Sequence, residues 1–250
     1  MIKVIAHRVN SIGALERAIS QGAQGIECDV QLTQDGHLVL YHNRMFGGKE
    51  IGQMRAEEVL QLHNEDEEGS LAITLDKLII NLKNNNKIES CFDVFIELKG
   101  NQSALPEKVL QLLAGDDALC SKVVMLSFNP DFVQRVEAIK QASPDLFAKI
   151  RTGLNIGKDS HRHPQGFVNE LHVGCLDECS NIIKGIGVEP NVFSLDCNLL
   201  QDDGGLEVLK ESGAKVICWT VNDASILKKV AQKDVDAVIT DEVKTISSAL

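Results

Sequence analysis

The chain has 250 residues, of which 44% are hydrophobic, and its formal net charge is −11 at pH 7. A chain of this length fits one or two domains, and the apolar share is enough to bury a large core. The negative charge argues against nucleic acid or an anionic membrane surface as a partner. We therefore expect an acidic globular protein that forms one domain over residues 1–250, a size that suits a single α/β barrel.

The opening MIKVIAHR contains an apolar run that is too short for the core of a secretory signal peptide. No stretch of the sequence approaches the length of a transmembrane helix. The seven cysteines are an odd number and include no CxxC pair, which is typical of reduced thiols buried in a protein interior. Together these features predict a cytoplasmic protein without stable membrane association.

Short β-rich runs alternate with amphipathic helical segments along the whole chain. The strands that we expect lie at residues 3–7, 25–32, 92–99, 122–128, 146–151, 191–196, 215–221 and 236–241. Helical patterns lie at residues 13–22, 131–141 and 225–233, and the polar segment 155–166 indicates a loop. Continuous apolar strands separated by helices are typical of a parallel sheet that is covered on both faces.

We expect eight such strand–helix units to close into a (β/α)₈ barrel. An open doubly wound sheet is the alternative architecture. The first strand is not followed by the GxGxxG pattern that would support a dinucleotide site in that alternative.

Two acids, Glu27 and Asp29, interrupt a strand that otherwise reads as buried. Ionised side chains are almost never buried unless they are paired or bind a metal. Because side chains alternate along a strand, both acids face the same side. His7 ends the first expected strand, Glu97 lies near the end of the third, and catalytic groups of such barrels collect at the C-terminal strand ends. The acids therefore predict a site at this rim.

The residues of this expected site have complementary chemistry. Three carboxylates repel one another unless a cation lies between them, and an all-oxygen set suits Mg²⁺, Ca²⁺ or Mn²⁺. Two histidines can supply and remove protons near neutral pH, and arginine and lysine can hold phosphate oxygens. The combination predicts cleavage of a phosphoester. The residues are His7, Arg8, Glu27, Asp29, His42, Glu97 and Lys99.

The order of these residues closely resembles that of the glycerophosphodiester phosphodiesterase family. The resemblance runs from the first expected strand to the last. It rests on AHR at 6–8, GIECDVQLTQDGHLVLYH at 25–42, FIELKG at 95–100, MLSF at 125–128, CWTVND at 218–223 and VITD at 238–241.

The resemblance implies a TIM barrel of the phospholipase C-like phosphodiesterase type. It implies hydrolysis of glycerophosphodiesters to sn-glycerol 3-phosphate and an alcohol, with one divalent cation. The implied metal ligands are Glu27, Asp29 and Glu97, and the implied acid and base are His7 and His42. Arg8 and Lys99 would bind the phosphate, and Trp219 could pack on the glycerol, although core packing is almost as good an explanation for that residue. Ser127 and Asp241 also match family positions at the rim, and we assign them no chemistry.

Three positions depart from the family pattern. Val9 replaces the usual glycine, and His42 is followed by Asn43 instead of aspartate. The loop NSIGAL lacks the usual glutamate, which Asn10 or Ser11 could partly replace. These departures leave two alternatives: a phospholipase like sphingomyelinase D, or a barrel that binds phosphate without catalysis. The presence of both histidines favours an enzyme, because binding alone does not need an acid and a base.

Overall fold

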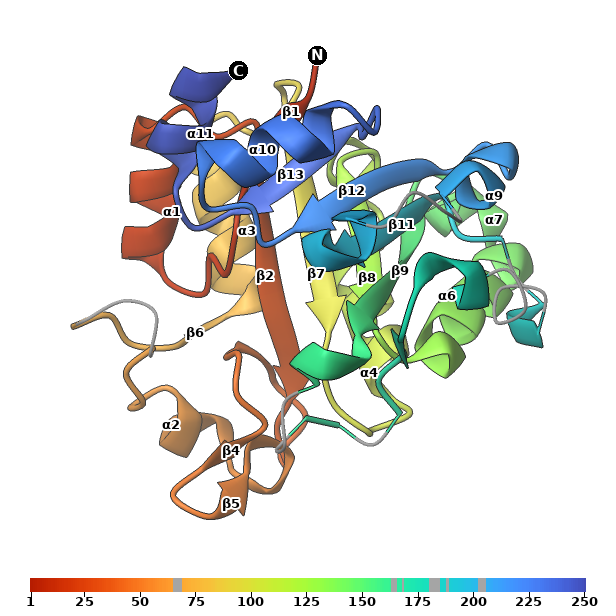
Figure 1. The fold of residues 1–250 in the computed structure, drawn as a ribbon. Helices are drawn as coiled ribbons and strands as arrows, with labels where there is room; N and C mark the ends of the chain where they lie inside the picture. The colour runs from red at the N-terminus through yellow and green to blue at the C-terminus, as the bar shows by residue number, and fades with distance from the viewer. Residues whose placement is uncertain (65–68, 163–165, 168, 180–184, 188, 202–205) are drawn as a thin grey trace.

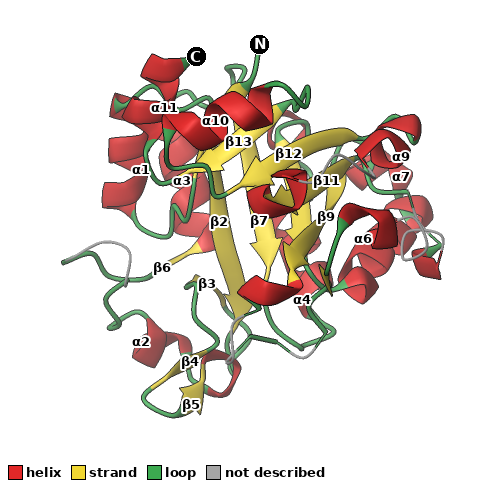
Figure 2. Cartoon of the chain, viewed as in Figure 1, coloured by secondary structure: helices red, strands yellow, loops and turns green. Residues whose placement is uncertain are grey.

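Eight parallel strands of the described residues close into a barrel, and helices surround it (Figures 1 and 2). The structure, a computed structural model, describes residues 1–64, 69–162, 166–167, 169–179, 185–187, 189–201 and 206–250. Strand β1 pairs with both β2 and β13, and this closes the ring. The barrel strands, in spatial order, are β1 (Lys3–Ala6), β2 (Gly25–Leu32), β7 (Asp93–Leu98), β8 (Val123–Ser127), β9 (Arg151–Lys158), β11 (Val192–Asp196), β12 (Lys215–Trp219) and β13 (Ala237–Thr240).

Seven of these strands lie where the sequence predicts them, but the prediction for residues 146–151 is wrong. That segment begins in the short helix α7 (Pro144–Phe147), and the strand β9 starts only at Arg151. Proline at the first helical position favours α7. Strand β9 is hard to recognise because it contains Gly153 and Gly157, and glycine is a poor strand former. Part of the predicted loop 155–166 is therefore barrel strand.

The helices lie on the outside of the barrel, and several start at side-chain caps. Ser11 accepts a hydrogen bond from the backbone N–H of Ala14, and Asp223 accepts from Ser225 and Ile226. Within the described residues, no helix is both long enough and apolar enough to cross a bilayer. The helices are α1 (Ile12–Ser20), α2 (Ala56–Val59), α3 (Leu75–Asn84), α4 (Leu105–Leu113), α5 (Asp117–Cys120), α6 (Pro130–Ala142), α7, α9 (Leu206–Glu211), α10 (Ala224–Ala231) and α11 (Val243–Ala249).

Side chains of the strands alternate between the barrel interior and the layer of helices. Ile26, Cys28 and Val30 of β2 belong to the large core between strands and helices, so Glu27 and Asp29 face the interior. A smaller apolar cluster fills the interior below the rim. Its members are Ile5, Phe95, Val124, Leu126, Val192, Ile217, Ala237 and Ile239.

A segment outside the barrel carries His42. Strand β3 (Leu38–Leu40) pairs antiparallel with the end of β2, and β6 (Ile73–Thr74) pairs with β3. Val39, Tyr41 and residues of the following turns form a separate small apolar cluster beneath this segment. The remaining short elements are β4 (Met45–Phe46), β5 (Lys49–Glu50), β10 (His172–Val173) and the 3₁₀ turns Ile51–Gln53, Asp159–His161, Leu176–Glu178 and Cys197–Gln201.

Candidate active site

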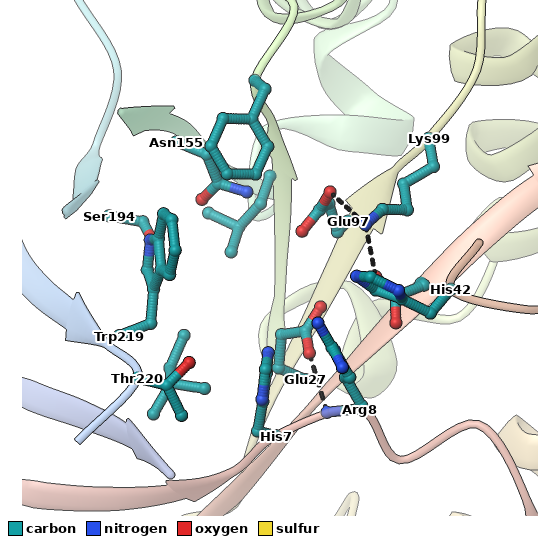
Figure 3. Close-up of a pocket in the computed structure, with 14 residues that line it drawn as sticks. His7, Arg8, Glu27, His42, Glu97, Lys99, Asn155, Ser194, Trp219 and Thr220 are labelled. Atoms are coloured by element: carbon teal, nitrogen blue, oxygen red, sulfur yellow. Dashed lines mark hydrogen bonds and ion pairs between the residues drawn. The ribbon is translucent and has the colours of Figure 1, made fainter. Parts of the chain in front are cut away.

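A pocket opens at the C-terminal ends of the barrel strands (Figure 3). The structure brings all eight site residues named from the sequence to this one pocket. It also adds Phe128, Asn155, Ser194 and Thr220, which the sequence did not suggest as site residues. The lining residues are His7, Arg8, Glu27, Asp29, His42, Glu97, Lys99, Leu126, Phe128, Asn155, Ser194, Trp219, Thr220 and Ile239.

Three buried carboxylates lie together on neighbouring strands. Asp29 and Glu97 are partners in the register between β2 and β7. One oxygen each from Glu27, Asp29 and Glu97 lies within 4.8 Å of the others. Burial and the neighbouring carboxylates raise the pKa of Glu27 well above its ordinary value, and burial raises the pKa of Glu97 to about 7. The surroundings therefore do not fully stabilise the ionised forms of Glu27 and Glu97.

These oxygens fit a hard divalent cation. Oε1 of Glu27 is buried and accepts no hydrogen bond within the described part of the chain. Its Oε2 accepts a bond of 2.9 Å from the backbone N–H of Arg8, which adopts a left-handed conformation with φ 50°. Carboxylate oxygens with open coordination capacity are the ligands that Mg²⁺, Ca²⁺ and Mn²⁺ prefer.

Asn10 fixes the orientation of Asp29. Its Nδ2 donates to Asp29 Oδ2 at 2.8 Å, and its Oδ1 accepts from the backbone N–H of Asp29 at 2.9 Å. The adjacent residues play other parts, because Ser11 caps α1 and Val9 is packed in the core. Asn10, one of the two suggested replacements, thus contacts the carboxylate cluster directly.

Lys99 lies between two of the carboxylates and is itself buried. Its Nζ is 3.1 Å from Asp29 Oδ1 and 3.3 Å from Glu97 Oε1. Although burial opposes the shift, these two carboxylates raise the pKa of Lys99. Lys99 in turn holds the pKa of Asp29 well below its usual range, against the effect of burial. Arg8 adds a second cation to the same side of the pocket (Figure 3).

Each histidine is oriented through Nδ1 by a side-chain oxygen. Nδ1 of His7 lies 2.8 Å from Asp241 Oδ1, and Asn222 donates to the other oxygen of Asp241. Nδ1 of His42 lies 3.0 Å from Asn43 Oδ1. An amide oxygen only accepts, so Nδ1 of His42 carries the proton and Nε2 has the lone pair. Each ring can therefore use Nε2 for chemistry.

The two histidines differ in their surroundings. His42 is paired with a neutral amide, and burial together with the Lys99 ammonium lowers its pKa to about 3. His7 instead lies against the carboxylate of Asp241. The sequence alone did not predict that Asp241 orients His7. The position of Asp241 at the end of the last strand, in VITD, could have indicated a place at the same rim.

Comparisons with known proteins identify the family of this chain. The model described as the glycerophosphoryl diester phosphodiesterase family matches residues 6–245. A glycerophosphodiester phosphodiesterase of Bacillus altitudinis is 33% identical, over 96% of this chain and 95% of its own. One from Caldanaerobacter subterraneus is 27% identical, over 97% and 95% of the two chains.

Solved structures show the same fold. A phosphodiesterase of Oleispira antarctica, in complex with the product sn-glycerol-3-phosphate, aligns over 99% of this chain and 96% of its own. The TM-score is 0.69 at 21% identity. Because the family model spans nearly the whole chain and the barrel carries the expected residues at one rim, this protein belongs to the glycerophosphoryl diester phosphodiesterase family and is a phosphoric diester hydrolase.

Proposed function

We propose that this enzyme hydrolyses glycerophosphodiesters to sn-glycerol 3-phosphate and an alcohol, using one divalent cation and two histidines. The observation that carries the proposal is the buried cluster of three carboxylates beside two histidines that are each oriented through Nδ1. A site that only bound phosphate would gain nothing from burying three acids next to an anion.

Glu27, Asp29 and Glu97 would hold the cation, with Mg²⁺ or Ca²⁺ preferred and Mn²⁺ acceptable. A bound cation would act as a Lewis acid on a phosphoryl oxygen. The raised pKa values of Glu27 and Glu97 support this assignment, because a cation would stabilise both acids in their ionised form. Asn10 would keep Asp29 in position for it.

Arg8 and Lys99 would bind the nonbridging oxygens of the phosphate. Lys99 has three N–H donors, and contacts to Asp29 and Glu97 account for two of them. The third is available for a phosphate oxygen. The guanidinium of Arg8 can make a two-point contact with the same group.

His7 and His42 would divide proton transfer between them. Hydrolysis of a phosphodiester needs a base for the attacking oxygen and an acid for the leaving alkoxide. Both rings line the pocket and come from different parts of the chain, His7 after β1 and His42 after β3. In-line displacement requires such groups on opposite sides of the phosphorus.

Glycerophosphocholine and glycerophosphoethanolamine are the substrates that we expect to be cleaved best. The net charge of −11 opposes docking to anionic bilayers. The test is a comparison of initial rates, with Mg²⁺, for these two diesters, sphingomyelin and a lysophospholipid. Preference for either lipid would favour the sphingomyelinase D-like alternative, and turnover of none of them, with retained binding of glycerol phosphate, would favour a binding barrel.

A further inference from the structure

The pocket has a second side that carries no charge. Asn155, Ser194 and Trp219 come from β9, β11 and β12, which are adjacent in the barrel. Figure 3 shows these three residues across the pocket from Glu97, Lys99 and Arg8. We call Asn155, Ser194 and Trp219 the neutral wall.

Each residue of the neutral wall holds a buried polar atom without a hydrogen-bond partner among the described residues. The atoms are Oδ1 of Asn155, Oγ of Ser194 and Nε1 of Trp219. The residues Asn155 and Ser194 are only 2% and 0% exposed. Leaving such a group unpaired costs about 1–3 kcal/mol, and more than nine-tenths of buried polar groups in proteins are paired.

Other buried polar side chains on the same strands do have partners. The hydroxyl of Thr152, on β9, donates to Glu137, and Asp196, on β11, accepts from His161 and Asn198. The unpaired atoms are therefore not a general feature of these strands. They are concentrated where the strands meet the pocket, which indicates that a ligand supplies their partners.

The three atoms define the chemistry of that ligand. The amide oxygen only accepts, the indole N–H only donates, and the serine hydroxyl does both. A phosphate or carboxylate would leave the Asn155 oxygen without a donor, and an ammonium would leave the Trp219 N–H without an acceptor. Hydroxyl groups both donate and accept, so a neutral group with several hydroxyls matches all three.

We infer that the neutral wall binds the hydroxyls of a polyol end of the substrate and selects for it, an inference that rests on the proposed function. The charged side would hold the phosphate, and the polyol would extend from it across the pocket. Phe128 lies edge-on to Trp219, with ring centroids 5.5 Å apart, and offers an apolar surface to the carbon chain. Asn155 and Ser194 thereby become specificity-determining residues.

The test compares two ligands that differ only in hydroxyls. Calorimetric affinities for sn-glycerol 3-phosphate and for n-propyl phosphate are measured in the presence of Mg²⁺ for the whole chain. We expect the wild type to prefer the glycerol compound by about tenfold or more. Asn155→Leu, Ser194→Ala and Trp219→Phe should each reduce that preference by about 3- to 10-fold, as expected for loss of a neutral hydrogen bond. Binding of propyl phosphate should be unchanged.

Thr152→Val is the matched control, because it removes a buried hydroxyl of β9 that points away from the pocket. It should leave the ligand preference unchanged. Ser194→Ala should not lower the melting temperature of the unliganded protein, since it removes an unpaired polar atom. The inference would be overturned if the wild type bound the two ligands with nearly equal affinity. It would also be overturned if the variants lowered the affinities for both ligands by the same factor.

Activity on glycerophosphocholine separates the two proposals. If the enzyme cleaves glycerophosphocholine but binds the two phosphate compounds equally well, the proposed function stands and the proposed role of the neutral wall is refuted. A hydroxyl preference in a protein that cleaves no phosphodiester would support the neutral wall and refute the proposed function.

Discussion

The two sides of the pocket use the same barrel rim in opposite ways. On the charged side, strands β1, β2 and β7 bring together acids and bases, and Lys99 pairs with Asp29 and Glu97, while Glu27 Oε1 has no partner among the described residues. On the neutral side, β9, β11 and β12 present polar atoms that the described residues leave unpaired. The first arrangement is organised around charge, and for the second we propose a ligand that carries hydroxyl groups.

This difference has an energetic consequence. Interactions with charged groups in a buried site are worth several kcal/mol, whereas one neutral hydrogen bond contributes about 0.5–1.5 kcal/mol net. Changes on the charged side should therefore abolish the reaction, and changes on the neutral side should alter selectivity by about tenfold. The following experiments test this contrast, beginning with the largest expected effect.

Removal of the cation should have the largest effect. After exhaustive chelation, or in Glu27→Gln, hydrolysis of glycerophosphocholine should fall by at least about 10³-fold, because a Lewis acid supplies several kcal/mol. The variant should remain folded, since glutamine replaces a carboxyl group whose ionised form is disfavoured by burial. Glu107→Gln, which alters a carboxylate paired with Arg135 on the outside of the barrel, is the control. Full activity after chelation would refute the metal assignment.

Loss of either histidine should have the next largest effect. His7→Ala and His42→Ala should each lower kcat by about 10²–10⁴-fold, the usual contribution of general acid–base catalysis. Metal binding, measured by calorimetry, should persist. The double variant should lose less than the product of the single losses, because both groups act in one transition state. Single variants within a few-fold of wild type, or no different from the exposed control His37→Ala, would disprove the mechanism.

The pH dependence of stability should reveal how unfavourable it is to ionise the buried acid cluster. The pKa of Glu97 is raised from 4.5 to about 7 in the folded chain, so the folded state retains a proton that the unfolded state has lost. The stability that this group contributes is fully present below pH 4.5 and is lost as the pH rises to about 7, by at most about 3 kcal/mol.

Denaturant unfolding of metal-free wild type and Glu97→Gln measures this directly. Subtracting the two stability curves separates the contribution of Glu97 from that of His42. The lowered pKa of His42 has the opposite effect on stability, because its contribution is present above pH 6.5 and is lost at lower pH. The difference should fall between pH 4.5 and 7 and then level off. A constant difference would show that Glu97 ionises normally. Excess Mg²⁺ should restore the lost stability in the wild type, because the ion favours the ionised acid.

The smallest of these effects should come from Asn10, which contacts the proposed metal ligand Asp29. Asn10→Ala should weaken Mg²⁺ affinity by about 10- to 100-fold, as is usual for residues that orient metal ligands. Its neighbour provides the control: Ser11→Ala removes the cap of α1 and should cost about 1 kcal/mol of stability without changing metal affinity. Equal metal affinities in the two variants would show that Asn10 does not help to position the metal ligand.

The charged side could be predicted from sequence because its residues break the expected pattern of their strands. Acids within GIECDVQL and FIELK are conspicuous among apolar neighbours, and both segments are strong strand formers. Asn155 and Ser194 are not conspicuous, because one neutral polar residue fits a loop or a strand equally well. The misplacement of β9 then put Asn155 into a predicted loop.

The sequence by itself predicted the barrel and the charged cluster, because apolar periodicity and the segments containing acids and histidines are local properties of the chain, and its resemblance to a known family predicted the class of enzyme. Only the tertiary structure decided which atoms find partners. Asp241 orients His7 across 234 positions of sequence, and Asn10 contacts Asp29 across 19. The unpaired atoms of the neutral wall also emerge only when three strands meet around one pocket. Hydrogen bonding depends on distances between segments remote in sequence, and barrel closure fixes those distances.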